Sequence, residues 1–207
     1  HQDKFFFVQP VSFLDRNHFN YLVRKYGGDK YVKSFSCWNQ LLTLMFGRLS
    51  NRESLRDLIV AINAHQKKSY HLGFGKHVSK SNLSKANQNR DYRLFEDFAY
   101  FLVDIQNVSV LWISSNWMAT SMRLINDDRL VSGCILVGKI RKPKGGIKIQ
   151  EGVWLIANLL VTLLQRSLAR PLSFSGLVTM VRIVPMYYTN LNTFFEKPDE
   201  DLKKIPM

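Results

Sequence analysis

The sequence predicts a mainly helical protein with a small β element. Apolar residues recur at helical spacing through much of the first hundred residues and again over 150–170. Between these regions the helical pattern fades, and two weakly alternating stretches, 108–113 and 133–140, suggest short strands. We therefore expect helical segments at 1–104 and 150–207, separated by an irregular segment at 105–149.

The first two predicted helices have clear boundaries. Asp15 or Asn17 can cap a helix that runs to Tyr26, and the glycines of GGD at 27–29 suit its end. Ser36 can cap a second helix with apolar residues at helical spacing: Trp38, Leu41, Leu42, Met45 and Phe46.

The third predicted helix follows SNRE at 50–53. Ser50 and Glu53 have the spacing of a capping box. The helix behind it, over 51–63, has one apolar face made of Leu55, Leu58, Ile59 and Ile62. Asp91 can cap a later helix that continues through Leu102.

Two helices are expected near the end of the sequence. The first runs from Gln150 to Arg170 and is stopped by Pro171, and the second covers 173–184. The run VWLIANLLVTLL at 153–164 is shorter than the roughly 20 residues that cross a bilayer, so we interpret it as a buried helix. The sequence thus predicts no membrane contact.

The stretch SKSNLSKANQNR, 79–90, is too polar for a core helix. With helix 51–63 and a glycine-bearing connection it forms a helix-turn-helix-like arrangement, capped by Ser79 or Ser81. Leu83 and Ala86 would hold it to the core. Its amides can read adenine edges and its basic groups can hold phosphates; the amides are Asn82, Asn87, Gln88 and Asn89, and the bases are Lys80, Lys85 and Arg90. The alternative is a solvated loop and cap.

The charge balance also points to a polyanionic partner. The chain has 29 Lys and Arg against 16 Asp and Glu, a net charge of +13. A second basic cluster lies near the glycines 145–146 and can contact a phosphate backbone. Its DNA-binding candidates are Lys142, Lys144 and Lys148. The alternative is that this cluster is a solvated basic turn. Double-stranded DNA is the expected partner.

Longer motifs resemble a known family. FSCWNQLLTLMFGRLSNRESLRDL at 35–58 and YHLGFGKHVSKSNLSKANQNRDYRLFEDFA at 70–99 resemble the N-terminal region of the IS-four insertion-sequence transposases, of the DDE class. Residues 145–202 are similar to the C-terminal helices of such enzymes, and KPKGGIK at 142–148 looks like a basic motif of the same family. The resemblance covers both ends of the chain.

This resemblance implies an N-terminal domain that binds the terminal inverted repeats of a bacterial mobile element. It also implies a ribonuclease-H-like domain that moves DNA by strand transfer. In that family two Mg²⁺ ions, held by two Asp and a Glu, stabilise the attacking and leaving oxygens.

The acidic triad is not recognisable in this chain. The region matching the family's first Asp reads LWISSNW at 111–117, with Ile113 where an Asp is expected. We therefore expect a transposase remnant, truncated by an internal deletion over the catalytic core, with neither a catalytic residue nor a metal ligand assigned. The alternatives are an active enzyme with an unorthodox carboxylate set, or a decayed fragment; the candidate carboxylates are Asp104, Asp127, Asp128 and Glu151.

The remaining expectations concern location and assembly. Cys37 and Cys134 lie far apart in the sequence without metal-type spacing, which favours a reducing compartment. We expect a cytoplasmic protein, with a homodimer as an option.

Overall fold

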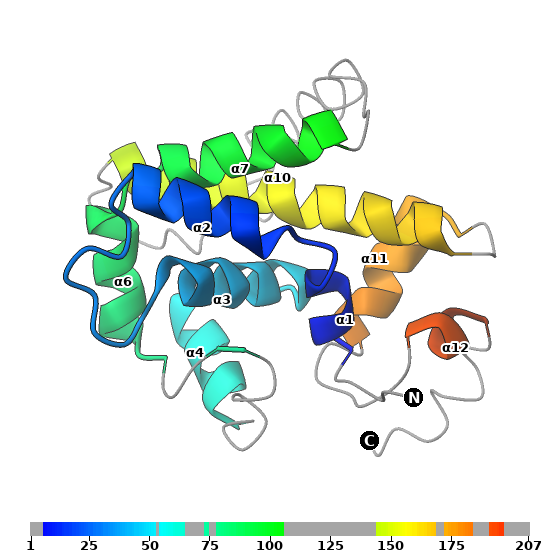
Figure 1. Ribbon diagram of the computed structural model, residues 1–207. Helices are drawn as coiled ribbons and strands as arrows, with labels where there is room; N and C mark the ends of the chain where they lie inside the picture. The colour runs from blue at the N-terminus through cyan, green and yellow to red at the C-terminus, as the bar shows by residue number, and fades with distance from the viewer. Residues whose placement is uncertain are drawn as a thin grey trace.

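The computed structural model describes residues 6–52, 54–64, 73–74, 78–105, 144–168, 172–183 and 191–196. All regular secondary structure in these residues is helical (Figure 1). The prediction of a mainly helical protein is thus confirmed. The expected strands at 108–113 and 133–140 lie outside the described residues.

The described helices follow one another along the chain. They are α1 (Val8–Val11), α2 (Arg16–Lys25), α3 (Cys37–Leu49), α4 (Leu55–Ala64), α6 (Lys80–Asn89), α7 (Arg93–Ile105), α10 (Lys144–Ser167), α11 (Phe174–Ile183) and α12 (Leu191–Glu196).

Several helices begin at the predicted caps. The Asp15 carboxylate accepts hydrogen bonds from the amides of Asn17 and His18 at the start of α2. The Ser36 hydroxyl accepts from Asn39 N at the start of α3. Of the two alternatives for α6, Ser79 is the cap, because its hydroxyl accepts from Asn82 N at 3.1 Å.

The predicted cap at Ser50 is wrong. Ser50 ends α3, and its hydroxyl donates to the carbonyl of Phe46 at 2.6 Å. The helix that follows begins at Leu55, and the Ser54 hydroxyl accepts from Asp57 N at 3.1 Å. The Ser50 side chain is thus used to close the preceding helix.

The long C-terminal helix also begins earlier than predicted, at Lys144 rather than at Gln150. Gly145 and Gly146 lie inside its first turn, although glycine weakens a helix. At Gly146 a Cβ atom would lie 3.2 Å from the carbonyl oxygen of Asn87 in α6. Because Gly146 has no side chain, α10 can approach α6 closely at this point.

Both ends of the chain contribute to one hydrophobic core. α10 packs along both α7 and α3, and α2 also packs against α7 (Figure 1). Gly152 brings α10 close to α7, because a Cβ atom there would lie 3.1 Å from Cβ of Phe95. At the N-terminal end, the Phe6 ring makes edge contacts with Phe194 and Phe195 of α12.

α10 is long and apolar enough to cross a membrane by length and composition. However, 56% of its most apolar window is buried against the rest of the molecule. This burial is what a core helix of a globular protein shows, and it agrees with the prediction of a buried helix at 153–164.

Candidate nucleic-acid interface

A groove of about 500 Å³ separates α6 from the loop that connects α2 to α3. We call the connecting segment, residues 26–35, the α2–α3 loop, and the space the loop–α6 groove. Both walls lie at the left of Figure 1. Its polar and charged lining residues include Lys30, Lys33, Ser34, Asn82, Lys85 and Asn89.

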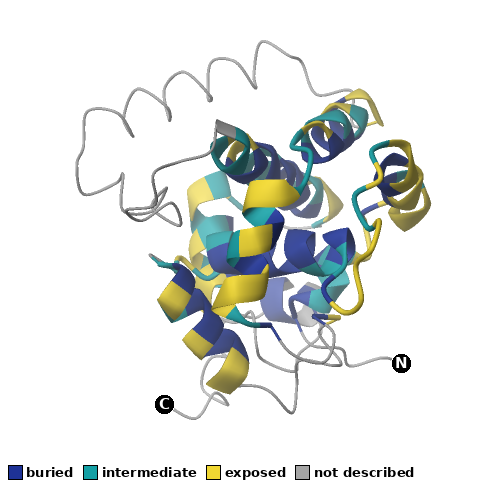
Figure 2. Cartoon of the chain, turned by 90° about the vertical axis from the view of Figure 1, so that its left-hand side faces the viewer, coloured by how far each residue is buried: buried dark blue, intermediate teal, exposed yellow. Residues whose placement is uncertain are grey.

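One stripe of α6 forms a wall of this groove. Asn82, Lys85 and Asn89 are spaced by three and four residues, so they lie on one side of the helix, and all three are exposed. Leu83 and Ala86 are buried, as predicted, and hold the helix to the core. Figure 2 views this end of the molecule, with exposed residues facing outward and buried ones toward the centre.

The groove carries a net positive charge. Lys30, Lys33 and Lys85 line it, and the acidic residue in its wall, Asp91, is neutralised by Arg93 at 2.6 Å. The hydrogen bond from Arg93 holds the pKa of the Asp91 carboxyl below its usual range. The described residues therefore form an anion-attracting surface there.

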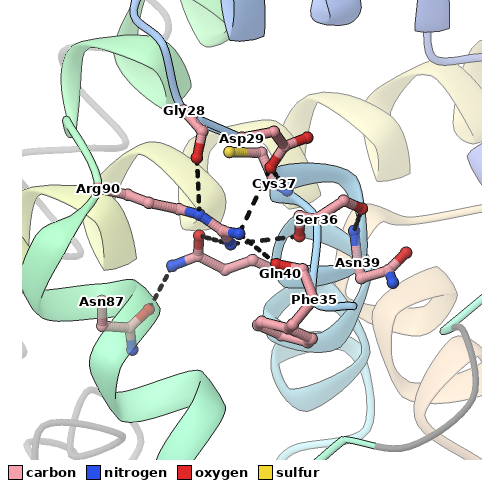
Figure 3. A network of polar contacts seen from close by, with 9 residues as sticks. All are labelled: Gly28, Asp29, Phe35, Ser36, Cys37, Asn39, Gln40, Asn87 and Arg90. Carbon is pink, nitrogen blue, oxygen red and sulfur yellow. Dashed lines mark hydrogen bonds and ion pairs between the residues drawn. The ribbon is translucent and has the colours of Figure 1, made fainter. Parts of the chain in front are cut away.

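Arg90 ends α6 and turns inward (Figure 3). Its side chain is only 6% exposed. The guanidinium donates to the carbonyls of Gly28 (3.3 Å) and Ser36 (3.2 Å), and also to the carbonyl of Phe35. Together these contacts attach both ends of the α2–α3 loop to the end of α6.

Side chains complete this network. Arg90 donates to Oε1 of Gln40 at 2.8 Å, and Nε2 of Gln40 donates to Oδ1 of Asn87 at 2.6 Å. Asp29 lies 3.4 Å from the guanidinium and also accepts from the backbone amide of Cys37 at 2.7 Å. Gln40 is fully buried, so the polar centre is enclosed (Figure 3).

Burial dominates the electrostatics of this centre. It lowers the pKa of the Arg90 guanidinium, an effect that the Asp29 carboxylate opposes. It also raises the pKa of the Cys37 thiol to about 12, so the thiol remains protonated at neutral pH. Cys37 behaves as a core residue rather than as a nucleophile.

The predicted DNA-binding residues of α6 thus separate into two groups. Asn82, Lys85 and Asn89 face the groove, whereas Asn87 and Arg90 bond to internal partners. The geometry favours a structural role for Arg90, because its donors are directed at buried acceptors. Lys80 is exposed but does not line the groove.

The second basic cluster is only partly described. Lys142 lies outside the described residues, and Lys144 begins α10. Lys148 is exposed, and its Nζ lies 4.1 Å from the centre of the Tyr92 ring. A hydrogen bond with Tyr92 raises the pKa of Lys148, which keeps its positive charge at the start of α10.

The second wall of the groove was missed by the sequence analysis. Lys30, Tyr31 and Lys33 belong to the α2–α3 loop, which the glycine pattern marked only as the end of a helix. The signal available was KYVKS at 30–34, in which two lysines flank an aromatic residue directly after a turn. Its position beside α6 depends on contacts that are distant in sequence.

The candidate carboxylates do not come together where they are described. Glu151 lies beside Gly152, which contacts Phe95, whereas Asp104 lies nine residues beyond Phe95 along α7, about 13 Å away. Asp127 and Asp128 lie outside the described residues. Within the described ranges, no group of three His, Cys, Asp or Glu side chains is arranged to hold a metal ion.

Comparison with known proteins gives one family match. A family model described as "Domain of unknown function (DUF4372)" matches residues 2–75. This range includes the α2–α3 loop and α3, but ends before α6. Searches of curated proteins and of solved structures found no match.

Proposed function

We propose that this chain is a transposase-derived protein that binds double-stranded DNA through α6 and the loop–α6 groove. The observation that carries the proposal is a preformed, positively charged groove beside a short helix with an outward amide stripe. The resemblance to IS-four transposases supplies the proposed target, the terminal inverted repeats of an insertion sequence.

The dimensions and chemistry of α6 suit this role. Its ten residues span about 15 Å, and a helix of this width fits the major groove of B-DNA. The amides of Asn82 and Asn89 can each form the paired hydrogen bonds that recognise adenine. Lys85, between them on the same stripe, can contact a phosphate and fix the helix in register.

The groove suits one strand of the DNA backbone. If α6 lies in the major groove, an adjoining sugar-phosphate strand runs past its side, where Lys33 of the loop and Lys85 of α6 both line the cavity. Two cations on opposite walls can neutralise successive phosphates of that strand. We therefore propose that the groove supplies affinity and that the amide stripe supplies sequence preference.

We propose that strand transfer itself has been lost. Asp104 and Glu151 are too far apart to share a metal ion, and Ile113 occupies the position where the family resemblance expects an Asp. The protein would then recognise element ends, as a monomer or a homodimer, without cutting them.

Fluorescence anisotropy over a range of salt concentrations tests the proposal. Binding of labelled inverted-repeat duplex should weaken with salt, and Lys33→Ala and Lys85→Ala should each reduce the slope of log K against log salt by about 0.9. Asn82→Ala and Asn89→Ala should reduce the preference over scrambled DNA with little change in slope.

Arg182→Ala is the matched control, because Arg182 is exposed on α11, away from the groove. It should leave both slope and affinity close to those of the unmodified protein. Absence of DNA binding at low salt, or equal effects of Lys85→Ala and Arg182→Ala, would contradict the proposal. A nicked product in the presence of Mg²⁺ would contradict the loss of strand transfer.

A further inference from the structure

The tip of the α2–α3 loop presents an aromatic ring to solvent. Tyr31 is 90% exposed, the largest exposed fraction among the large hydrophobic side chains described. It lines the loop–α6 groove together with Lys30 and Lys33. A ring exposed to this extent is accessible to a ligand, and an aromatic side chain offers a large contact area to one.

The backbone at Tyr31 is unusual as well. Its φ angle is +63°, in the left-handed region that bulky side chains rarely adopt. Such conformations cost free energy and persist where the surrounding structure imposes them, often at functional sites. Here the turn hydrogen bonds from Lys30 N to Gly27 O and from Val32 N to Asp29 O hold the loop on either side.

The loop is also anchored at both ends. Arg90 binds the carbonyls of Gly28, Phe35 and Ser36, so the tip projects from a fixed base rather than from a free segment (Figure 3). An exposed ring on a fixed base loses little freedom when a ligand stacks on it. This is the arrangement expected of a binding residue.

The groups around the ring indicate the kind of ligand. Lys30 Nζ lies 5.3 Å from the centre of the Tyr31 ring, and Lys33 lies two residues further along the chain. An aromatic platform flanked by cations is the arrangement that binds unpaired nucleotides, in which the base stacks and the phosphates pair with the lysines. On the opposite wall of the groove, Lys85 adds a further cation for these phosphates.

We propose that Tyr31 is a base-stacking residue, and that the loop–α6 groove prefers DNA in which an unpaired base adjoins the duplex. This inference rests on the proposed function, which supplies duplex DNA as the ligand of α6. Inside a duplex both faces of each base are covered by its neighbours, so a ring can stack only where a base is unpaired or terminal. Lys30 and Lys33 would hold the phosphates that flank this base.

The test compares two labelled DNA molecules, a fully paired duplex and the same duplex with a short single-stranded overhang that contains 2-aminopurine. The unmodified protein should bind the overhang DNA about tenfold more tightly, and stacking should change the 2-aminopurine fluorescence. Tyr31→Gly should lose both the preference and the fluorescence change. Tyr31→Phe keeps the ring and should retain both.

Tyr31→Gly also separates binding from folding. Glycine adopts a φ of +63° without steric cost, so this variant should unfold at about the same temperature as the unmodified protein. Tyr100→Ala is the control, because Tyr100 is 59% exposed on α7 and does not line the groove. It should bind both DNA molecules as the unmodified protein does.

The outcomes distinguish the two proposals. If the protein binds duplex DNA but Tyr31→Gly keeps the overhang preference, or no preference exists, the stacking role is wrong while DNA binding by α6 stands. If neither DNA binds, both proposals fail. A large loss of thermal stability in Tyr31→Gly would mean that the ring serves the fold, which would also overturn the inference.

Discussion

The interior between α3, α7 and α10 is apolar, whereas the interior between α3, α6 and the α2–α3 loop is polar. In the first, phenylalanine and leucine side chains fill the space. In the second, Arg90, Gln40 and Asn87 form a chain of hydrogen bonds. The same helix, α3, faces both.

The apolar interior and the polar interior therefore have different roles in the protein. Apolar packing is non-directional and stabilises the fold in proportion to the area buried. A buried guanidinium contributes less net stability, but its fixed fork of donors specifies where each acceptor must lie. The polar interior lies directly beneath the loop–α6 groove, so it sets the positions of the groove walls.

The largest effect is expected in the apolar interior. Phe95→Ala removes a fully buried ring that packs against Phe19 of α2, and should lower the free energy of unfolding by about 4 kcal/mol. Urea denaturation followed by circular dichroism measures this loss. Tyr100→Ala, on the exposed side of the same helix, should change stability by less than about 0.5 kcal/mol.

In the polar interior, Arg90→Ala should cost about 3 kcal/mol, because it leaves Gln40 Oε1 and three backbone carbonyls without their donor. Arg90→Lys keeps the charge but cannot reach all of these acceptors. In either variant, amide hydrogen exchange should speed up at Lys30 and Val32, because their backbone amides form the turns of the loop.

DNA binding also distinguishes two possible roles of the Arg90 side chain. If Arg90 positions the loop, Arg90→Lys should weaken binding without changing the salt slope. If Arg90 instead contacts a phosphate, Arg90→Lys should bind almost normally and Arg90→Ala should reduce the slope by about 0.9. The second pattern would contradict the role that the buried contacts indicate.

The boundary between the two interiors offers a smaller, matched test. Gly146→Val places a side chain against the Asn87 carbonyl and should cost about 2 kcal/mol through forced separation of α10 and α6. At Gly145 a Cβ atom would meet nothing within 4 Å, so Gly145→Val should be neutral or slightly stabilising. Thermal unfolding of both variants compares them directly; equal destabilisation would argue against the close approach.

The smallest effect is expected from surface carboxylates. Burial alone would raise the pKa of Asp97, but hydrogen bonds from Tyr26 and Lys25 lower it overall, and the hydrogen bond from Arg93 lowers that of Asp91. A lowered pKa contributes stability above the unfolded value, near pH 4, and this stability is lost as the pH falls further.

Asp91→Asn combined with Asp97→Asn should therefore flatten the decrease in unfolding free energy below about pH 4. The total effect should remain under about 1 kcal/mol because both ion pairs are partly exposed. Urea denaturation at pH 7 and at pH 3 measures it. An unchanged pH dependence in the double variant would show that other groups govern acid stability.

Local patterns in the sequence predicted much of the helical framework. The caps Asp15, Ser36 and Ser79 were correct, because a side chain that bonds to an amide two or three residues later depends only on nearby chain. The buried positions Leu83 and Ala86 followed from helical spacing. Ser50 misled because a hydroxyl can serve either the helix before it or the helix after it.

The sequence by itself predicted a polar helix within residues 79–90 and determined which side chains of this stretch carry charge or amides. Only the tertiary structure decided that Arg90 turns inward while Lys85 faces a groove. Arg90 meets acceptors at residues 28–40, more than 45 positions earlier, and such partners leave no trace in local spacing. The direction of a long charged side chain is set by the acceptors that folding brings within reach.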